Sequence, residues 1–460
     1  MWRPEIEQAL EPPYLAIVGA LNTDIGAGRL RWGDRLPTHR ELADTLHVAI
    51  GTVSRAYKEA ERRGLVRGEV GRGTFVGGSG PSPMSSLLEP VAHESAVIDL
   101  SCNYPVYGEG PDLADTLRRL SQKCDLRHLL RYQPHAGLLR HRTAGADWAS
   151  RYGINTAADS VLVCNGAQHA LAVVLSAIAE PGDLVVTEGL TYPGMKVLAN
   201  MLRLKLMGLP MDENGLMPGG FESVCRKRRV RALYLMPTIQ NPTGTTLPEA
   251  RRRRIARIAA EYDVAIVEDD VHRLLAEDPP PPLQTLAPER TYFVAGLSKA
   301  VTGGLRIGYL IAPPHAVERL IQSLWATCWM VAPLTAEIAT VWIEDGTADQ
   351  VLARKRDEAR ARQDMARHLL NGLSYRTSPH SFHLWLRLPG EWDGASFAVE
   401  ARRRGVAITP ADAFAVGKTF VSNEVRVCLG AAEDRNQLEK GLNLLVSTLA
   451  CAPGTCPALM

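Results

Sequence analysis

A lysine in a glycine-rich segment is the first residue that invites a chemical interpretation. Lys299 lies in SKAVTGGLRIGYL, residues 298–310, directly after Ser298 and seven residues before Arg306. A lysine amine can add to a carbonyl group, and a hydroxyl and a guanidinium can bind a phosphate. A lysine taken alone is usually a solvated side chain, so this interpretation depends on what the rest of the chain supplies.

Several positions earlier in the chain come at or just beyond short apolar runs. Gly166 and Ala167 follow VLVCN, Tyr192 lies in EGLTYPG, Asn241 lies in QNPTG, and Asp269 lies in VEDD. Backbone amides at a helix start can bind a phosphate. Each side chain also has an ordinary interpretation: a helix-capping acid at 269, a turn residue at 241 and a half-buried tyrosine at 192. Each motif by itself is a weak signal, and only the ordered set is specific.

The elements that must hold these residues alternate between strands and helices. Short β-branched or aliphatic runs at 161–165, 184–188, 232–237 and 264–270 are separated by helical segments. This alternation predicts an α/β fold with a parallel sheet that is covered on both faces. Ligands of such sheets lie at the carboxyl ends of the strands, where most of the residues above fall.

Residues 12–77 form a different unit, with three predicted helices and a hairpin. An apolar stripe predicts a helix within 14–30, Thr38 and Glu41 predict a capping box for a second, and a third helix runs from Ile50 to about Arg63. Between residues 29 and 75, ten Lys and Arg exceed six Asp and Glu by four. A helix-turn-helix with a hairpin can insert one helix into the major groove, and the basic excess suits phosphate contacts.

The linker sequence and the composition indicate how the chain is divided and which classes of protein it can belong to. Residues 77–97 read GGSGPSPMSSLLEPVAHESAV, whose Gly, Ser and Pro predict a linker. With 46% hydrophobic residues and a net charge of +2, the chain suits a globular protein whose nucleic-acid surface is a local patch. Its eight cysteines have no zinc or redox spacing, and no secretory signal or transmembrane stretch stands out. We therefore expect a cytoplasmic protein without a metal site.

The pattern LPxxRELAxxLxVxxxTVxxAY…GLV…GxGTFV, within residues 36–76, resembles the winged-helix head of the GntR family. The resemblance implies that double-stranded DNA is a partner and that the contacts come from Arg40, Thr52, Arg72 and Gly73. Many relatives carry an arginine at the position of Ile50, and an isoleucine cannot make a bidentate contact to guanine. The alternative is a winged helix used for protein contact.

The larger unit resembles the fold-type I aminotransferases in the order of its motifs. The SK-(six residues)-R spacing and the EDD strand end look most like the MocR branch, in which such a body follows a GntR-type head. The resemblance implies a mostly parallel central sheet and a small α/β subdomain at about 350–460. The predicted domains are the head at 10–77, the linker at 78–97 and the body at 98–460.

The resemblance also implies pyridoxal 5′-phosphate as cofactor and gives the site residues their roles. Lys299 would form the Schiff base with the cofactor aldehyde. Asp269 would keep the pyridine nitrogen protonated, with Asp270 as the alternative. Asn241 would donate to the phenolic oxygen, and Tyr192 would stack on the ring. The groups expected at the phosphate are those of Gly166, Ala167, Ser298 and Arg306.

Two further residues receive roles from the same resemblance. Tyr132, in YQPHAG, resembles the tyrosine that reaches the neighbouring subunit's phosphate in a homodimer. Arg426, in VRVCLG, resembles the arginine that binds a substrate carboxylate, so a small amine or amino acid is the implied effector. A salt bridge on the strand surface is the alternative for Arg426.

The departures from the family pattern concern catalysis more than cofactor binding. Relatives usually carry a tyrosine just after the EDD acids, where this chain has Val271 and His272. His272 is a possible substitute, but its spacing differs by one residue. His380 and His383 lead into a strand, and we interpret both as structural.

Three functions are compatible with these features. The first is ligand-controlled regulation, in which the body binds the cofactor and then an amine or amino acid, or senses the cofactor itself. The second is a working aminotransferase that carries a DNA-binding head. The third is a DNA-binding scaffold that has lost its cofactor, against which the complete set of ring and phosphate groups argues.

Overall fold

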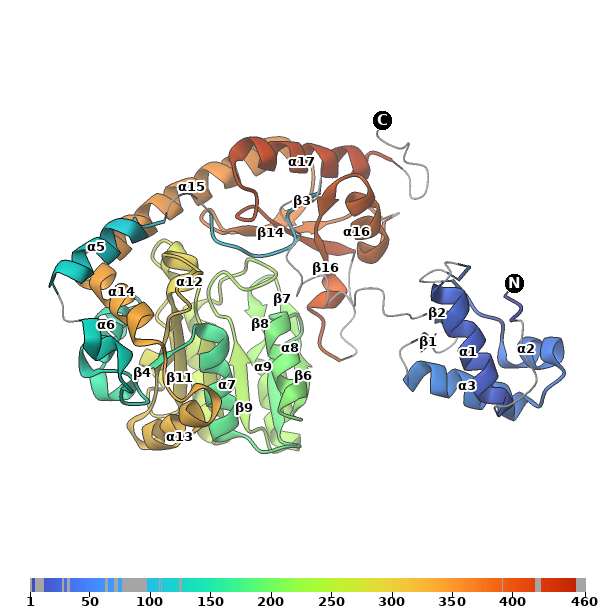
Figure 1. The fold of residues 1–460 in the computed structure, drawn as a ribbon, viewed down its shortest axis with the longest axis horizontal. Coiled ribbons are helices and arrows are strands. Elements are labelled where there is room, and N and C mark those ends of the chain that lie inside the picture. Colours follow the sequence, from blue (N-terminus) through green and yellow to red (C-terminus); the bar gives the residue numbers. More distant parts are fainter. Residues whose placement is uncertain are drawn as a thin grey trace. The chain divides into compact units, whose positions relative to one another are not determined.

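The computed structural model describes residues 2–4, 12–26, 29–30, 34–62, 65–69, 73–76, 97–106, 108, 110–123, 126–390, 392–417 and 423–451. The chain divides into two compact units, Met1–Leu88 and Glu89–Met460, and each is described by itself (Figure 1). The division falls within the predicted linker. No helix in the described ranges is long and apolar enough to cross a membrane.

The described residues of the amino-terminal unit form three helices and a two-stranded antiparallel sheet. Its elements are α1 (Pro13–Gly26), α2 (His39–Leu46), α3 (Ile50–Arg62), β1 (Val66–Glu69) and β2 (Gly73–Val76). The predicted capping box is present, because the Thr38 side chain accepts from the Glu41 backbone and the Glu41 side chain from that of Thr38. His47 ends α2 in the left-handed conformation, which turns the chain into α3. One residue from each helix, Leu21, Leu42 and Val53, is fully buried in the shared core.

A seven-stranded sheet lies at the centre of the larger unit, with the strand order β4-β12-β11-β10-β9-β5-β6. Neighbouring strands run parallel except at β12, which is antiparallel to both neighbours. The predicted mostly parallel α/β fold is therefore confirmed. The strands are β4 (Val161–Cys164), β5 (Leu184–Glu188), β6 (Lys205–Leu209), β9 (Ala232–Leu235), β10 (Ala265–Asp269), β11 (Thr291–Gly296) and β12 (Gly308–Ile311).

Helices cover both faces of this sheet, as Figure 1 shows. Because successive side chains of a strand point to opposite faces, Val161 and Val163 pack with Trp148 of α6, whereas Leu162 packs with Leu171 of α7. The helices are α5 (Leu113–Lys123), α6 (Leu139–Ser150), α7 (Ala167–Ile178), α8 (Pro193–Met201), α9 (Pro218–Lys227), α10 (Glu249–Glu261), α11 (Leu283–Leu286), α12 (Leu297–Ala300), α13 (Val317–Cys328) and α14 (Pro333–Glu344).

A smaller sheet follows the long helix α15 (Thr347–Leu369). Its antiparallel strands, in the order β13-β14-β17-β16, are β13 (Tyr375–Arg376), β14 (His383–Arg387), β17 (Glu424–Cys428) and β16 (Thr409–Pro410). Helices α16 (Gly394–Arg403) and α17 (Arg435–Leu449) pack with it. The first strand of the larger unit, β3 (Ile98–Asp99), pairs with β15 (Val406–Ala407), so the chain enters this unit beside the smaller sheet. A short hairpin is formed by β7 (Met211–Asp212) and β8 (Gly215–Leu216).

Candidate functional site

Five of the predicted site residues lie at or just beyond the carboxyl ends of strands of the seven-stranded sheet, as expected for a parallel sheet. Asp269 is the last residue of β10, and Lys299 lies in α12, which begins directly after β11. Gly166 is the cap of α7 after β4, and Tyr192 is the cap of α8 after β5. Asn241 lies in the segment that follows β9. The sheet therefore collects residues that are far apart in the sequence.

Asp269 presents a buried carboxylate with one oxygen still in need of a donor. The Tyr234 hydroxyl donates to Oδ2 at 2.9 Å, whereas Oδ1 is buried without a hydrogen-bond partner among the described residues. Burial raises the pKa of Asp269 to about 6, and the bond from Tyr234 opposes that shift. A protonated ring nitrogen would satisfy the free oxygen and neutralise the charge.

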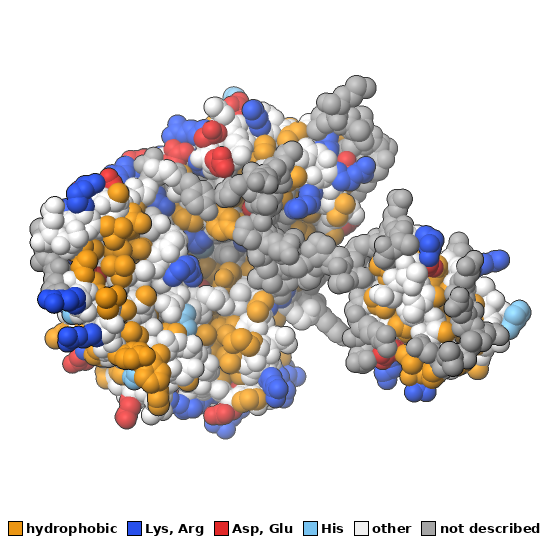
Figure 2. All heavy atoms as spheres, viewed as in Figure 1, with side chains coloured by type: hydrophobic (Ala, Val, Ile, Leu, Met, Phe, Trp, Pro, Cys, Tyr) orange, Lys and Arg blue, Asp and Glu red, His pale blue; other side chains and the backbone are white. Residues whose placement is uncertain are grey.

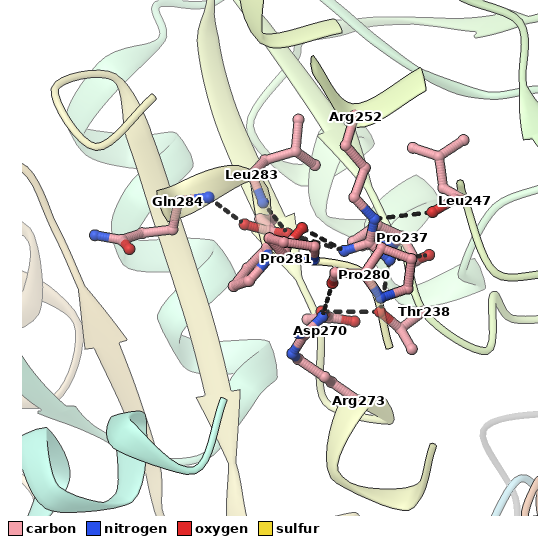
Figure 3. Close-up of polar contacts among 12 residues, drawn as sticks. Pro237, Thr238, Leu247, Arg252, Asp270, Arg273, Pro280, Pro281, Leu283 and Gln284 are labelled. Atoms are coloured by element: carbon pink, nitrogen blue, oxygen red, sulfur yellow. Dashed lines mark hydrogen bonds and ion pairs between the residues drawn. The ribbon is translucent and has the colours of Figure 1, made fainter. Parts of the chain in front are cut away.

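Asp270, the residue after Asp269, lies in a buried polar network with Thr238 and Arg252 (Figure 3). Asp270 Oδ2 accepts a hydrogen bond from the Thr238 hydroxyl at 3.0 Å. Arg252 donates to the same hydroxyl at 3.0 Å and lies 4.0 Å from Glu268. Glu268 and Asp269 are the last two residues of β10, whose successive side chains point to opposite faces, and Asp270 follows the strand.

Asp270 Oδ1, like Asp269 Oδ1, has no hydrogen-bond partner among the described residues. The Asp270 carboxylate, however, is held by Thr238 and lies 3.6 Å from Arg273. Lys299 and Tyr192 lie near Asp269, so Asp269 is the better candidate for the ring nitrogen.

The Lys299 amine lies in the middle of the site, where it donates to the backbone carbonyl of Asn103. Burial and the nearby Arg426 cation lower the pKa of Lys299 to about 8. A larger fraction of the amine is therefore unprotonated near neutral pH than in a solvated lysine. The unprotonated form is the one that adds to a carbonyl carbon.

Arg426, from β17, brings a buried guanidinium to the same place. Its Nη1 donates to Asn241 Oδ1 at 2.7 Å, and its Nη2 donates to the Ser101 carbonyl at 2.5 Å. The guanidinium carbon lies 4.7 Å from the centre of the Phe414 ring, and Nε is buried without a partner among the described residues. Within those residues no acidic side chain forms an ion pair with Arg426, and this leaves its charge available to an incoming carboxylate.

Gly166, Ser298 and Arg306 form a tight corner at the start of α7. Gly166 has a φ of +79°, and a Cβ at this position would lie 2.7 Å from Arg306 Nη2. Arg306 Nη1 donates to the Ser298 hydroxyl at 3.5 Å. Gly166, the N-cap of α7, has no side chain that could accept a hydrogen bond from the first turn of the helix. The backbone amides of that turn, including the amide of Ala167, can therefore donate to a bound group. Amides, a hydroxyl and a guanidinium thus meet where a phosphate can bind.

Two other predicted residues differ in their surroundings. Tyr192 is largely buried, which raises its pKa, and the neighbouring Asp269 charge adds to the shift. Its ring lies against Gly194, where a Cβ would come within 2.3 Å of it. Tyr132 is 84% exposed, and its ring contacts that of Trp329 with 5.8 Å between centroids. Tyr132 therefore lies on the surface of its own chain, apart from the groups around Lys299.

A polar cluster beside Lys299 was not predicted from the sequence. Asn103 Nδ2 lies 3.3 Å from both His272 Nε2 and His383 Nδ1. Burial holds the pKa of His272 well below its usual value and lowers that of His383 to about 3, so both rings are neutral at neutral pH. His383, which we interpreted as structural, thus lies within the site. No metal-binding group of three or more His, Cys, Asp and Glu side chains exists in the described part of the chain.

In the head, the described DNA-contact candidates lie on different elements. Arg40 is exposed on α2, and Thr52 is half-buried on α3. Gly73 begins β2 with a φ of +118°, and a Cβ there would lie 3.1 Å from Arg35 Nε. Arg72 lies outside the described residues.

Comparison with known proteins identifies both units. The family of aminotransferases of class I and II matches residues 95–445, and the gntR family of bacterial regulatory proteins matches residues 13–76. YdeF of Bacillus subtilis, an uncharacterized HTH-type transcriptional regulator, is 31% identical over 444 residues, which are 96% of each chain. PdxR of Corynebacterium glutamicum, an HTH-type pyridoxine biosynthesis transcriptional regulator, is 28% identical over 358 residues, 76% of this chain and 77% of that one.

A solved structure supports the fold of the body. The α-aminoadipate aminotransferase LysN of Thermus thermophilus, complexed with N-(5′-phosphopyridoxyl)-L-leucine, has a TM-score of 0.72 and 24% identity, with 80% of this chain and 94% of that chain covered. The chain therefore belongs to the HTH-type transcriptional regulators that join a gntR-family head to a body of the aminotransferase class I and II family.

Proposed function

We propose that this regulator holds pyridoxal 5′-phosphate on Lys299 and changes its binding to double-stranded DNA when a small amine or amino acid enters the same site. One observation carries the proposal: Lys299 and Arg426 both donate to the backbone of one short segment, at the carbonyls of Asn103 and Ser101. In sequence, this segment follows the stretch 77–96 that connects the body to the head.

The residues around Lys299 fit the cofactor. When bound, pyridoxal phosphate supplies an aldehyde that reacts with amines and a ring that accepts electrons. Asp269 would hold the ring nitrogen, and Tyr192 would cover a face of the ring. Asn241 accepts from Arg426 through Oδ1, which leaves its amide hydrogens for the phenolic oxygen. The phosphate would be bound by Gly166, Ala167, Ser298 and Arg306.

Ligand binding would exchange the contacts of the segment 101–103. A covalent bond to the cofactor would take the Lys299 amine away from the Asn103 carbonyl. An amine effector that replaced Lys299 on the cofactor would free that amine again, and a carboxylate on the effector would compete with the Ser101 carbonyl for Arg426. Buried carbonyls without donors are costly, and the segment therefore shifts or finds new partners. The Thr409 hydroxyl still donates to the Ser101 carbonyl at 2.9 Å. Such an exchange alters DNA binding only if the ligand prefers one arrangement of the segment over the other.

The head would bind the operator through the contacts expected of a gntR-type winged helix. The residues that we assign to DNA are Arg40, Thr52, Arg72 and Gly73. Phosphate neutralisation by basic residues would supply the sequence-independent part of the affinity. We expect the protein to act in the cytoplasm, where its DNA target lies.

An exposed apolar patch supports a homodimer. Figure 2 shows hydrophobic side chains gathered over α14 and α13. The members of this patch, each at least 43% exposed, are Leu130, Tyr132, Leu139, Trp325, Trp329 and Leu334. Large exposed apolar patches usually mark interfaces. A second copy on this patch would bring Tyr132 to the neighbouring phosphate corner and give two heads for paired half-sites.

The decisive experiment joins a chemical label to a DNA-binding assay. The purified protein is reduced with borohydride, and the labelled peptide is identified by mass spectrometry. We expect the label on Lys299, its loss in Lys299→Ala, and its retention in Lys205→Ala, which removes an exposed surface lysine. In parallel, a panel of amines and amino acids is tested for a change in visible absorbance and in the retardation of upstream DNA. An unlabelled Lys299 would refute the proposal and favour a scaffold without cofactor.

A second candidate function is transamination by the same site. The lowered pKa of Lys299 favours it, because a partly unprotonated lysine can move protons as well as bind the cofactor. Steady turnover of an amino donor and an oxo acid by the purified protein would support this function. Spectral change without turnover would support sensing alone.

A further inference from the structure

The exposed face of α3 begins with an apolar side chain. Ile50, the first residue of α3, is 49% exposed, whereas Val53, Ala56 and Tyr57 of the same helix are buried in the core of the head. A single exposed isoleucine is common on protein surfaces, so its position is what matters. In helix-turn-helix heads, the N-terminal residues of the second helix reach the edges of the bases.

The neighbours of Ile50 leave it as the dominant side chain at this end of the helix. Gly51 is exposed, and no atom lies within 4 Å of a Cβ built there. Thr52 is short and half-buried. Arg55, the first long polar side chain of α3, has its guanidinium carbon 4.1 Å from the ring centre of Tyr14. The first turn of α3 therefore offers apolar surface and no side chain that could make a bidentate bond to a base.

We propose that Ile50 selects thymine in each operator half-site by packing against its C5-methyl group. Among the four bases, only thymine presents a methyl group in the major groove. Burial of one methyl group against an apolar side chain favours binding about fourfold. The absence of a side chain at Gly51 lets the helix backbone come close to the base edges at this point. The inference rests on the proposed DNA-binding function and deepens it.

The test removes the methyl group without touching any hydrogen bond. Binding sites are selected from random duplexes with the full-length protein, and each conserved thymine is then replaced by deoxyuridine. We expect one position per half-site where the replacement weakens binding about fourfold. Ile50→Ala should bind the thymine duplex about as weakly as the wild type binds the deoxyuridine duplex. This variant should also no longer distinguish thymine from uracil at that position.

Two more variants separate base selection from folding. Ile50→Arg should select guanine in place of thymine at the same position, because arginine makes a bidentate contact to guanine. Ser54→Ala, at another exposed position of α3, should keep the preference for thymine. Equal affinity for thymine and uracil at every position, or a uracil effect that persists in Ile50→Ala, would overturn the inference. If no duplex is selected or retarded even at low salt, the proposed DNA binding itself fails, and the inference fails with it.

Discussion

At the scale of single residues, burial moves two ionisable groups of the site toward neutrality. It raises the pKa of Asp269 to about 6 and lowers that of Lys299 to about 8. Each shift is a free-energy cost of keeping the charged form in the folded protein. A bound cofactor would relieve both costs, since its ring nitrogen pairs with the acid and its aldehyde takes up the amine. The site is thus arranged for a ligand at the expense of the stability of the free protein.

The pKa of Asp269 predicts how the stability of the cofactor-free protein changes with pH. Because burial raises that pKa from 3.8 to about 6, the charged form destabilises the folded state, and stability falls as the pH rises through this range. Between pH 5 and pH 7, the free energy of unfolding should fall by about 1 kcal/mol more in the wild type than in Asp269→Asn. Urea titrations after cofactor removal with hydroxylamine measure this difference. Parallel curves for the two proteins would show that the carboxylate is not buried as described.

Arg426 should decide whether the effector needs a carboxylate. Its guanidinium has a free Nε and no acidic partner among the described residues. Arg426→Ala should weaken the binding of a responsive amino acid about 10- to 100-fold, because a charge-assisted bond is lost. The corresponding amine without the carboxylate should bind both proteins alike. Arg387→Ala, at an exposed position of β14, is the matched control, and visible titrations give the affinities. Equal losses for the amino acid and the amine would contradict the role of Arg426.

At the scale of elements, the turn from β4 into α7 requires a glycine for two reasons. Gly166 has a φ of +79°, and a Cβ there would lie 2.7 Å from Arg306 Nη2. Gly182 has a φ of +94° with no atom within 4 Å of a built Cβ. Alanine at either position should therefore cost about 1–3 kcal/mol in backbone strain.

These two glycines allow strain to be separated from cofactor binding. Gly166→Ala should also displace the Arg306 guanidinium and weaken cofactor binding at least about tenfold. Gly182→Ala should leave cofactor binding unchanged. Thermal unfolding and cofactor titration of both variants test this pair. If both bind the cofactor equally well, Gly166 has no part in phosphate binding.

Elements with local signals could be predicted from the sequence. The capping box at Thr38, the turn at His47 and the strands that end near Cys164, Glu188 and Asp269 lie where their short-range patterns place them. Local hydrogen bonds and the periodicity of apolar residues determine these features, so a single sequence carries the information. The antiparallel course of β12 was not predicted, because strand direction depends on the connection and not on the apolar run itself.

The missed part of the site consists of contacts between distant segments. Asn103 meets His272 and His383 across 169 and 280 residues of sequence. No periodicity links such positions, and each residue type has an ordinary interpretation in its own segment. The one available signal was the place of Asn103, shortly after the linker and before the body's first described helix, α5. The tertiary fold creates this cluster, whereas the family motifs reveal only Lys299 and its usual partners.

At the scale of the whole molecule, one short segment both contacts the proposed ligand-binding residues and follows the stretch between the two units in sequence. Residues 101–103 accept bonds from Lys299 and Arg426 and lie just beyond the stretch that joins the two units in sequence. The proposed homodimer adds a second connection, because Tyr132 would complete the phosphate site of the other subunit. Cofactor binding, dimer formation and head pairing would then depend on one another.

That dependence can be tested with variants that change either the apolar patch or the Tyr132 hydroxyl group, but not both. Leu130→Asp combined with Trp329→Asp places two charges in the apolar patch and should convert the dimer to monomers that release the cofactor readily. Tyr132→Phe keeps the apolar ring and should remain dimeric, yet lose about tenfold in cofactor affinity, since a charge-assisted hydrogen bond to the phosphate disappears. Val399→Asp, at a 64% exposed position of α16, should change neither property. Sedimentation velocity and cofactor titration measure the two effects separately. A dimer that survives both aspartates would place the interface elsewhere, and unchanged affinity in Tyr132→Phe would remove the shared phosphate site while leaving the patch as an interface.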